Sequence, residues 1–222
     1  MAFQFIICYN ASGVVVMNDE KAEQFLKSGA LSEPFLDVKI IEQKVMSDYN
    51  AKVKSGQAAS KVASLISFIK HNLKPAGSGD DIANKKFSRT AKEVWESCKA
   101  TGCTDYCLVF AVFARQLGVP CIMTDTVSEK WAQNHNNGIK QDVLNGHTFC
   151  ECMHNGKWFV VDVINEKWFE KTSEDVISLD YKVNGEDKFF VVEHGIDFGK
   201  RQTSKEHYEK IEKYCKSLIK DM

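Results

Sequence analysis

The chain has 222 residues, of which 44% are hydrophobic, and its 29 basic side chains nearly balance 30 acidic ones. A chain of this length and composition can bury a substantial core, and we expect one compact domain with an appended helical segment. The balanced charge produces no net field that would attract nucleic acid, an anionic membrane or an acidic substrate, so none of these is an expected partner.

Neither a membrane span nor a secretion signal is predicted. Uninterrupted apolar runs such as residues 108–114 are about seven residues long, whereas a spanning helix needs roughly 20. The N-terminus has no basic region, and Asn10, Ser12 and Gly13 interrupt its apolar stretch. We therefore expect a cytoplasmic protein whose eight cysteines stay free thiols, mostly buried.

The first third of the chain is predicted to be mostly helical. Short apolar runs at residues 4–10 and 14–17 indicate strands or buried extended pieces, and a weakly amphipathic polar stretch follows at 18–27. Between residues 47 and 73 apolar side chains recur at helical spacing, which predicts one long helix or two short ones that separate near Gly56.

A linker is predicted at residues 74–86, where Pro, Gly, Ser and Asp are concentrated. After it, Ser88 before a run of helix formers predicts a capped helix that continues to Cys98 and ends over residues 99–102. The linker would separate the helical N-terminal portion from the segment that carries the chemistry.

The centre of the expected fold is a helix from Cys103 to Leu117. Gly118 closes this helix, and Pro120 lies beyond it. Because its side chains are apolar nearly all round, the helix should be buried on most sides.

An antiparallel sheet is predicted after this helix, which gives an α+β fold class. Asn155-Gly156 is a strong hairpin signal between two alternating segments. The expected strands are residues 121–127, 147–153, 157–164 and 188–194, with a polar loop at 128–146. As a single domain, the chain divides into a mostly helical N-terminal segment (1–80), a core (85–195) and a C-terminal helix (202–222).

Cys103 is the best candidate for a reactive thiol. It follows Gly102 at the first turn of the buried helix, where the helix dipole and unpaired backbone N–H groups favour the thiolate. A single cysteine is more often an inert small hydrophobic residue, and this is our interpretation of Cys107, one turn further along.

The predicted hairpin brings a histidine and an acid together. With a two-residue turn, Phe149 pairs with Asp162, and alternation places His147 and Asp162 on the same face as diagonal neighbours. Such neighbours are roughly 7–8 Å apart along the backbone, within side-chain reach. A thiolate needs a base, and the base needs an orienting acceptor, so Cys103, His147 and Asp162 form a candidate catalytic triad.

Histidine alone would more often be a hydrogen-bonded structural residue, and the diagonal acid reverses that preference for His147. A zinc site made of His147, Cys150, Cys152 and a helix thiol is disfavoured, because both cysteines point to the opposite sheet face and their spacing is unusual for zinc. No metal ligand is expected. The histidines interpreted as structural are His71, His135, His154, His194 and His207.

Three ordered motifs resemble the core of the transglutaminase-like superfamily. They are TGCTDYCLVFAVFARQLGVP, GHTFCEC and GKWFVVD, and the resemblance covers about residues 90–165. The family pattern is Gly-Cys-x-Asp/Glu-aromatic, a helix ending in Arg-x-x-Gly-Ile-Pro, His-x-aromatic-x-Glu, and Trp before a strand Asp. The resemblance implies a papain-like fold, shared by transglutaminases, cysteine proteases and peptide N-glycanases. Carried over by position, it implies Cys103 as nucleophile, His147 as base and Asp162 as orienting acid.

The chain departs from the family pattern at the rim and in the packing of the site. Phe149 stands where Trp is usual, Cys107 where a small Ala is common, and Val163 where Pro often follows the Asp. Asp105 also matches the family, and we expect it to compensate the helix dipole rather than to act in catalysis. The backbone N–H of Cys103 is the natural first oxyanion donor, while the second is not identified.

The expected function is hydrolysis of a peptide or side-chain amide through a thioester, because the chain lacks the extra domains of the large calcium-dependent transglutaminases that it resembles. Protein-glutamine transglutaminase or deamidase activity is the alternative, and a catalytically idle binding module is the alternative from another class. No cofactor is expected, and the substrate would be a protein or peptide. The loop at 128–146, with Trp131, is either a substrate-contacting rim or a plain solvated insertion.

Overall fold

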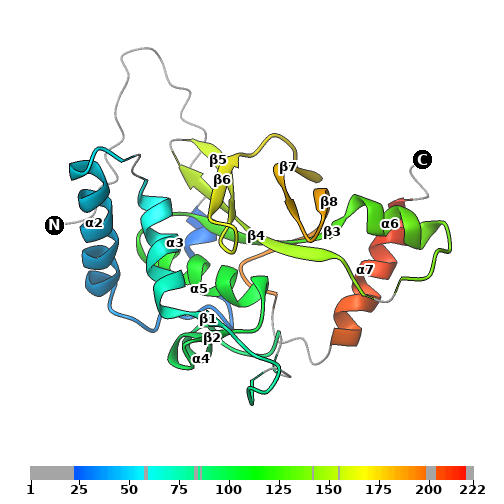
Figure 1. The fold of residues 1–222 in the computed structure, drawn as a ribbon, viewed down its shortest axis with the longest axis horizontal. Helices are drawn as coiled ribbons and strands as arrows, with labels where there is room; N and C mark the ends of the chain where they lie inside the picture. The colour runs from blue at the N-terminus through cyan, green and yellow to red at the C-terminus, as the bar shows by residue number, and fades with distance from the viewer. Residues whose placement is uncertain are drawn as a thin grey trace, which may run out of the picture.

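One antiparallel sheet and the helices packed against it make up the fold, which was obtained as a computed structural model (Figure 1). The structure describes residues 23–57, 60–82, 85, 87–141, 143–154, 156–198 and 204–218. Within them the main sheet has the strand order β6-β5-β4-β3-β8-β7, and a small parallel sheet pairs β1 with β2. The strands are β1 (Lys74–Pro75), β2 (Lys99–Ala100), β3 (Cys121–Ser128), β4 (Gly146–His154), β5 (Lys157–Asp162), β6 (Lys167–Glu170), β7 (Val176–Val183) and β8 (Glu186–Gly195).

The helices flank the sheet and include one that runs through the centre of the molecule, α5. In chain order they are the 3₁₀ turn η1 (Gln24–Leu26), α2 (Val38–Lys54), α3 (Lys61–Asn72), α4 (Ala91–Glu96), α5 (Cys103–Gln116), α6 (Glu129–Asn136) and α7 (Ser204–Leu218). The predicted C-terminal helix is thus confirmed as α7 over the residues that the structure describes there.

Helix α5 begins at the predicted residue, Cys103, ends one residue before the predicted Leu117, and has the predicted burial. Every residue from 105 to 115 is buried, because the helix packs on the sheet and against α2, α3 and α4. After the C-cap residue Leu117 the chain turns away at Gly118, whose φ of +76° lies in the left-handed region that glycine adopts without strain. The buried helix therefore fixes the position of its own first residue, Cys103, relative to the sheet.

The hairpin of β4 and β5 has the predicted register. His154 pairs with Lys157 and Cys150 with Val161, so residues of the two strands alternate between the same two faces. Cys150 and Val161 lie in the larger core cluster with α5, whereas Phe149 and Val160 lie in a separate cluster on the other face. A slip by one residue would move His147 to the wrong face of the sheet.

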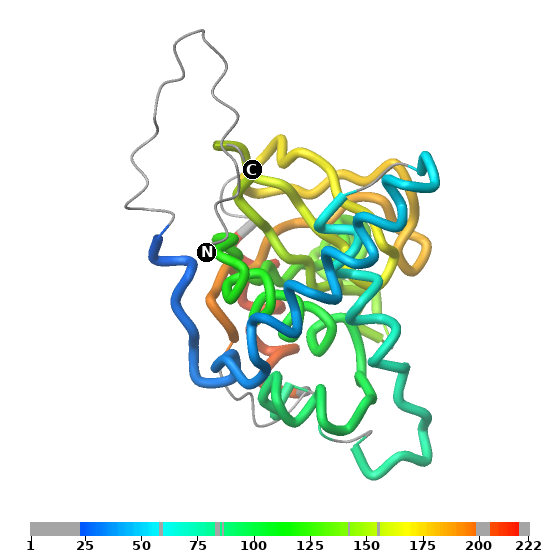
Figure 2. The backbone as a smooth tube through the Cα atoms, turned by 90° about the vertical axis from the view of Figure 1, so that its left-hand side faces the viewer, coloured from blue at the N-terminus to red at the C-terminus, as the bar shows by residue number. Residues whose placement is uncertain are grey.

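The N-terminal helical region differs from the prediction in where it begins. The sequence predicts helix only from residue 47, but α2 already starts at Val38, where the Asp37 side chain accepts a hydrogen bond from the Lys39 N–H at 2.9 Å. The predicted separation near Gly56 is confirmed, since α2 and α3 are two helices that lie side by side (Figure 2).

The prediction for residues 74–98 is wrong at two points. Lys74 and Pro75 are not linker but form β1, which pairs with β2. The helix that follows is capped by Thr90 instead of Ser88: Thr90 and Glu93 form a reciprocal capping box. Arg89 consequently lies outside the helix, with its side chain free to reach another part of the fold.

The predicted polar loop at 128–146 contains a helix, α6. The Ser128 side chain caps it by accepting a hydrogen bond from the Trp131 N–H at 3.0 Å. Trp131 is buried and packs edge-on against Tyr208 of α7, so it belongs to a core cluster and not to a substrate-contacting rim. Strands β6 and β7 are two further elements that the sequence does not predict.

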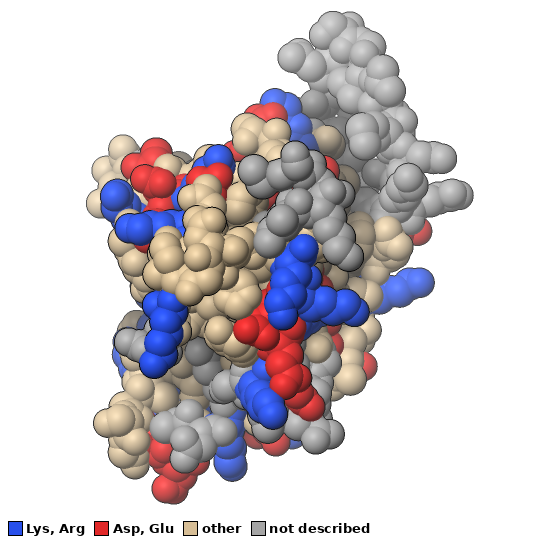
Figure 3. Space-filling model, turned by 90° about the vertical axis from the view of Figure 1, so that its right-hand side faces the viewer, with Lys and Arg blue, Asp and Glu red and all other residues tan. Residues whose placement is uncertain are grey.

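The remaining predictions concern the ends and the surface. The apolar runs at residues 4–10 and 14–17 lie outside the described residues. Among the described residues, no helix combines the length and the apolar character that crossing a bilayer requires. On the face that carries α6 and α7, basic and acidic side chains are intermingled (Figure 3).

Candidate active site

Cys103 is the first residue of α5. The backbone N–H groups of a helix's first turn lack intrahelical partners, and together with the helix dipole they favour negative charge at this position. The Cys103 side chain is partly exposed, whereas five of the seven described cysteines are buried, and all seven are free thiols. A thiol whose position at a helix N-terminus favours ionisation is thus also accessible to a substrate.

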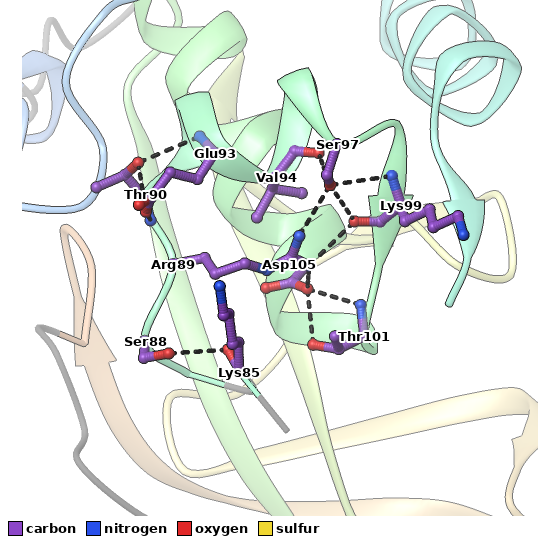
Figure 4. Close-up of polar contacts among 10 residues, drawn as sticks. All are labelled: Lys85, Ser88, Arg89, Thr90, Glu93, Val94, Ser97, Lys99, Thr101 and Asp105. Carbon is purple, nitrogen blue, oxygen red and sulfur yellow. Dashed lines mark hydrogen bonds and ion pairs between the residues drawn. The ribbon is translucent and has the colours of Figure 1, made fainter. Parts of the chain in front are cut away.

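A buried ionic network holds the turn that leads into Cys103 (Figure 4). The Asp105 carboxylate accepts hydrogen bonds from the backbone N–H and the hydroxyl of Thr101, both at 2.7 Å. It is paired with the Arg89 guanidinium, which also donates to Ser97 and to the Lys99 carbonyl. Asp105 therefore does more than compensate a helix dipole, because it anchors the chain on both sides of the nucleophile to α4 and β2.

His147 and Asp162 are hydrogen-bonded as the hairpin register predicts. The His147 Nε2 atom lies 3.1 Å from the Asp162 Oδ1 atom, and the two side chains are 5% and 0% exposed. The Phe149 ring packs against the imidazole in a T-shaped arrangement, with ring centroids 4.7 Å apart. The imidazole is thus fixed on one side by a carboxylate and on another by an aromatic ring.

Two residues that the sequence analysis missed complete the surroundings of Asp162. Asn165 donates from its backbone N–H at 3.2 Å and from its side-chain amide at 2.8 Å, and the Tyr181 hydroxyl donates at 2.9 Å. An Asn three residues after a strand Asp is a local turn signal that could have been noticed. Tyr181 comes from β7, so nothing near Asp162 in the sequence indicates it.

The two titrating groups of the site shift in opposite directions. Burial raises the pKa of the Cys103 thiol, but its hydrogen bond with His147 and the imidazolium charge lower it by more, from an ordinary value of about 9 to about 7. Burial lowers the pKa of His147, but Asp162 and Cys103 raise it by more, from 6.5 to about 10. Thiolate and imidazolium are therefore the favoured pair between about pH 7 and pH 10.

The other cysteines near the site face the core. Cys107 is buried, and its thiol donates to the Thr148 carbonyl at 3.1 Å. Cys150 and Cys152 lie in the core cluster with α5, on the sheet face opposite to Phe149 and His147, as alternation along β4 requires. Within the part of the chain that the structure describes, no group of His, Cys, Asp or Glu is arranged to hold a metal ion.

Glu151, the last residue of the His-x-aromatic-x-Glu motif, has partners of its own. Its fully buried carboxylate accepts hydrogen bonds from Thr124 at 2.9 Å and Lys171 at 2.7 Å, and lies 3.1 Å from the His194 ring. These partners neutralise the charge and lower the Glu151 pKa against the effect of burial. Glu151 therefore joins β3, β4 and β8 and does not contact the thiol site.

Comparison with known proteins identifies the family. The family model described as the transglutaminase-like superfamily matches residues 44–163, more than half of the chain. The chain therefore belongs to the transglutaminase-like superfamily. Its α+β fold, in which the helix that carries Cys103 packs on the sheet that carries His147 and Asp162, is the predicted papain-like class.

One solved structure and the curated proteins complete the comparison. The structure is that of a candidate cysteine protease from Cytophaga hutchinsonii, which is 15% identical with a TM-score of 0.48. The match covers 83% of this chain and 50% of that one, so this chain spans about half the length of that protein. Among curated proteins, no significant match is found.

Proposed function

We propose that the protein is a thiol-dependent acyl-transfer enzyme that hydrolyses a peptide or side-chain amide. Cys103 is the nucleophile, His147 the general base and acid, and Asp162 the residue that orients the imidazole. The observation that carries the proposal is the hydrogen bond of 3.1 Å between the buried side chains of His147 and Asp162, next to a thiol at a helix N-terminus. Membership of the transglutaminase-like superfamily supports the same kind of enzyme.

In the acylation step the Cys103 thiolate attacks the amide carbonyl carbon, and the carbonyl oxygen takes up the negative charge. The backbone N–H of Cys103 is one donor to that oxyanion. His147 gives its proton to the nitrogen of the leaving amine, the C–N bond breaks, and a thioester on Cys103 remains. Asp162 stays ionised and holds the imidazole in the orientation that this transfer needs.

In the deacylation step neutral His147 takes a proton from water, and the hydroxide attacks the thioester. The C–S bond breaks, the carboxylic acid leaves, and His147 and Cys103 return to the imidazolium–thiolate pair. If an amine replaces water, the same thioester gives a new amide, which is the transglutaminase alternative. The chemistry up to the thioester is identical, so the acceptor decides between the two activities.

A panel of small amide, ester and glutamine-donor substrates tests the proposal, each assayed with and without an added primary amine. We expect an acyl adduct on Cys103 in intact-protein mass spectra, with release of the acid and no requirement for amine. Cys103→Ala should abolish adduct and turnover, whereas Cys107→Ala should keep both. Amine-dependent product would favour the transglutaminase alternative.

One combination of results would contradict the proposed function. If no substrate of the panel acylates the protein, and Cys103 reacts with iodoacetamide no faster than the exposed thiol of Cys98, the proposed function is wrong. A binding module that keeps the fold is then the better interpretation.

A further inference from the structure

Thr148 is the residue directly after His147 on β4, and its side chain lies on the strand face that packs against α5. It is buried, with 2% of its surface exposed. The Thr148 hydroxyl oxygen lies 3.0 Å from that of Thr104, the residue directly after Cys103. The Thr148 carbonyl accepts the hydrogen bond from Cys107 one helical turn further on. Thr148 thus contacts the start of α5 at two residues that follow the nucleophile.

Thr148 also affects the ionisation of the Cys103 thiol beside Thr104. Its hydroxyl and its backbone N–H both lower the pKa of that thiol. His147 and Thr148 are neighbours on a strand and point to opposite faces. The start of β4 therefore presents donors to the sulfur from two directions.

We propose that the Thr148 hydroxyl is a further catalytic group that donates a hydrogen bond to the Cys103 thiolate, and that Thr104 orients it. The inference rests on the proposed function of Cys103 as nucleophile. It assigns a role to a position of the His-x-aromatic-x-Glu motif that the motif leaves unspecified.

The direction of the hydrogen bonds follows from counting hydrogens. A threonine hydroxyl has one hydrogen to donate and two lone pairs to accept with. If the Thr148 hydrogen points at the sulfur, the contact of 3.0 Å between the hydroxyls can only be a donation from Thr104 to Thr148. The resulting chain, Thr104 to Thr148 to Cys103, strengthens its terminal bond because each donor polarises the next.

Such a donor affects the reaction at the points where the sulfur is negative. It stabilises the resting thiolate, so more of the enzyme is in the reactive form, although each thiolate becomes a weaker nucleophile. It also stabilises the thiolate that leaves when the thioester is hydrolysed. The hydrogen bond to the sulfur is stronger when the sulfur is a charged thiolate than when it is part of the neutral thioester. Unlike His147, the hydroxyl transfers no proton.

The test is the pH dependence of the rate at which iodoacetamide alkylates Cys103 in the full chain, mapped by mass spectrometry. Thr148→Val keeps the shape of the side chain but removes the donor, and should raise the pH midpoint by about one unit, since a hydrogen bond to a charged group is worth about that much. The rate at the high-pH plateau should rise about threefold, as nucleophilicity follows the thiol pKa. If Thr148 had a purely structural role, its replacement would not raise the pH midpoint and the plateau rate together.

Companion variants define the role further. Thr148→Ser should restore the wild-type midpoint, and Thr104→Val should raise it by a few tenths of a unit. The double variant should match Thr148→Val alone, because Thr104 acts only through Thr148. Thr126→Val is the structural control: Thr126 is also buried on a neighbouring strand and donates to the His147 carbonyl at 2.8 Å, and its loss should leave the midpoint unchanged.

The proposal is overturned if wild-type Cys103 shows an activated profile and Thr148→Val shows the same one. If Thr148→Val does not fold, as judged by circular dichroism, Thr104→Val decides alone, because Thr104 is partly exposed and tolerates the change. An unchanged midpoint in that variant then refutes the chain of donors. Failure of the proposed function differs from these results, since wild-type Cys103 would then react no faster than Cys98.

Discussion

The Tyr181 hydroxyl donates a hydrogen bond of 2.9 Å to the Asp162 carboxylate, although the two residues belong to opposite halves of the sheet. Tyr181 lies on the edge strand β7, and Asp162 lies on β5, next to the other edge. The bond can form because the sheet curls until its two ends approach each other. The acid that orients the proposed base is therefore held by the closure of the whole sheet and not by the hairpin alone.

Tyr181→Phe should destabilise the fold by about 2 kcal/mol, because it removes a hydrogen bond to a charged acceptor. Urea unfolding measures the change. Tyr106→Phe is the matched control, since the Tyr106 hydroxyl donates a longer bond, 3.3 Å, to the neutral Leu73 carbonyl and should cost less. Equal losses in the two variants would contradict a special role for the bond to Asp162.

The alkylation rate of Cys103 should rise with pH through a midpoint at about 7 and then level off. The sign follows because the reactive thiolate forms as the proton is lost. In His147→Ala the partner that most lowers the thiol pKa is gone while burial still raises it, so the midpoint should move well above pH 7. Peptide mapping across pH gives both curves, with Cys98 as the exposed reference and Cys107→Ala as the variant that should change nothing. Coincident curves for wild type and His147→Ala would show that the imidazole does not activate the thiol.

Arg89→Ala should destabilise the protein by about 3–5 kcal/mol, because it leaves the Asp105 carboxylate buried without its cation. It should also slow alkylation of Cys103, since Asp105 anchors the turn before the nucleophile. Lys92→Ala is the control, because Lys92 pairs with Glu96 on the exposed side of the same helix region and such pairs contribute at most about 1 kcal/mol. Thermal unfolding of both variants provides the comparison, and similar melting temperatures would refute the anchoring role.

Gly146→Ala should displace the start of β4 and with it His147. A β-carbon at this position would lie 2.6 Å from the Thr126 carbonyl oxygen of β3, too close for two paired backbones to accommodate without moving. We expect a loss of turnover of at least tenfold, since a shift of about 1 Å at a catalytic group has a large effect. Gly79→Ala, where a β-carbon meets nothing within 4 Å, should retain wild-type turnover. Normal activity of Gly146→Ala would mean that the strand can shift without moving the imidazole.

The parts of the site that the sequence predicts are those with local determinants. Helix α5 carries its own start, its apolar surface and its closing Gly118, and the hairpin carries a turn signal and an alternating pattern that together set the register of His147 and Asp162. Arg89 and Tyr181 could not be assigned in this way, because their partners are brought to them by tertiary packing.

The fold was mispredicted where the decisive contact is distant in sequence. Helix α6 has eight mostly polar residues, and its apolar side consists largely of Trp131 and Ala132, which are buried between α7 and the strands β3 and β8. Strand β6 is four residues long and mostly exposed, so it lacks an apolar alternation that a sequence pattern could detect. Ser88 and Thr90 are both possible N-cap residues for α4. Only the reciprocal hydrogen bonds between Thr90 and Glu93 select Thr90.

The order of the site residues along the chain has a consequence for biosynthesis. Cys103 leaves the ribosome before His147, Asp162 and Tyr181, and the contact with His147 that most lowers its pKa is long-range, so it forms late in folding. A nascent or misfolded chain should therefore present Cys103 as an ordinary thiol that cannot attack amides in neighbouring proteins. In a mixture of folded and unfolded molecules, a slow electrophile at neutral pH would then mark the folded ones selectively at this residue and count them.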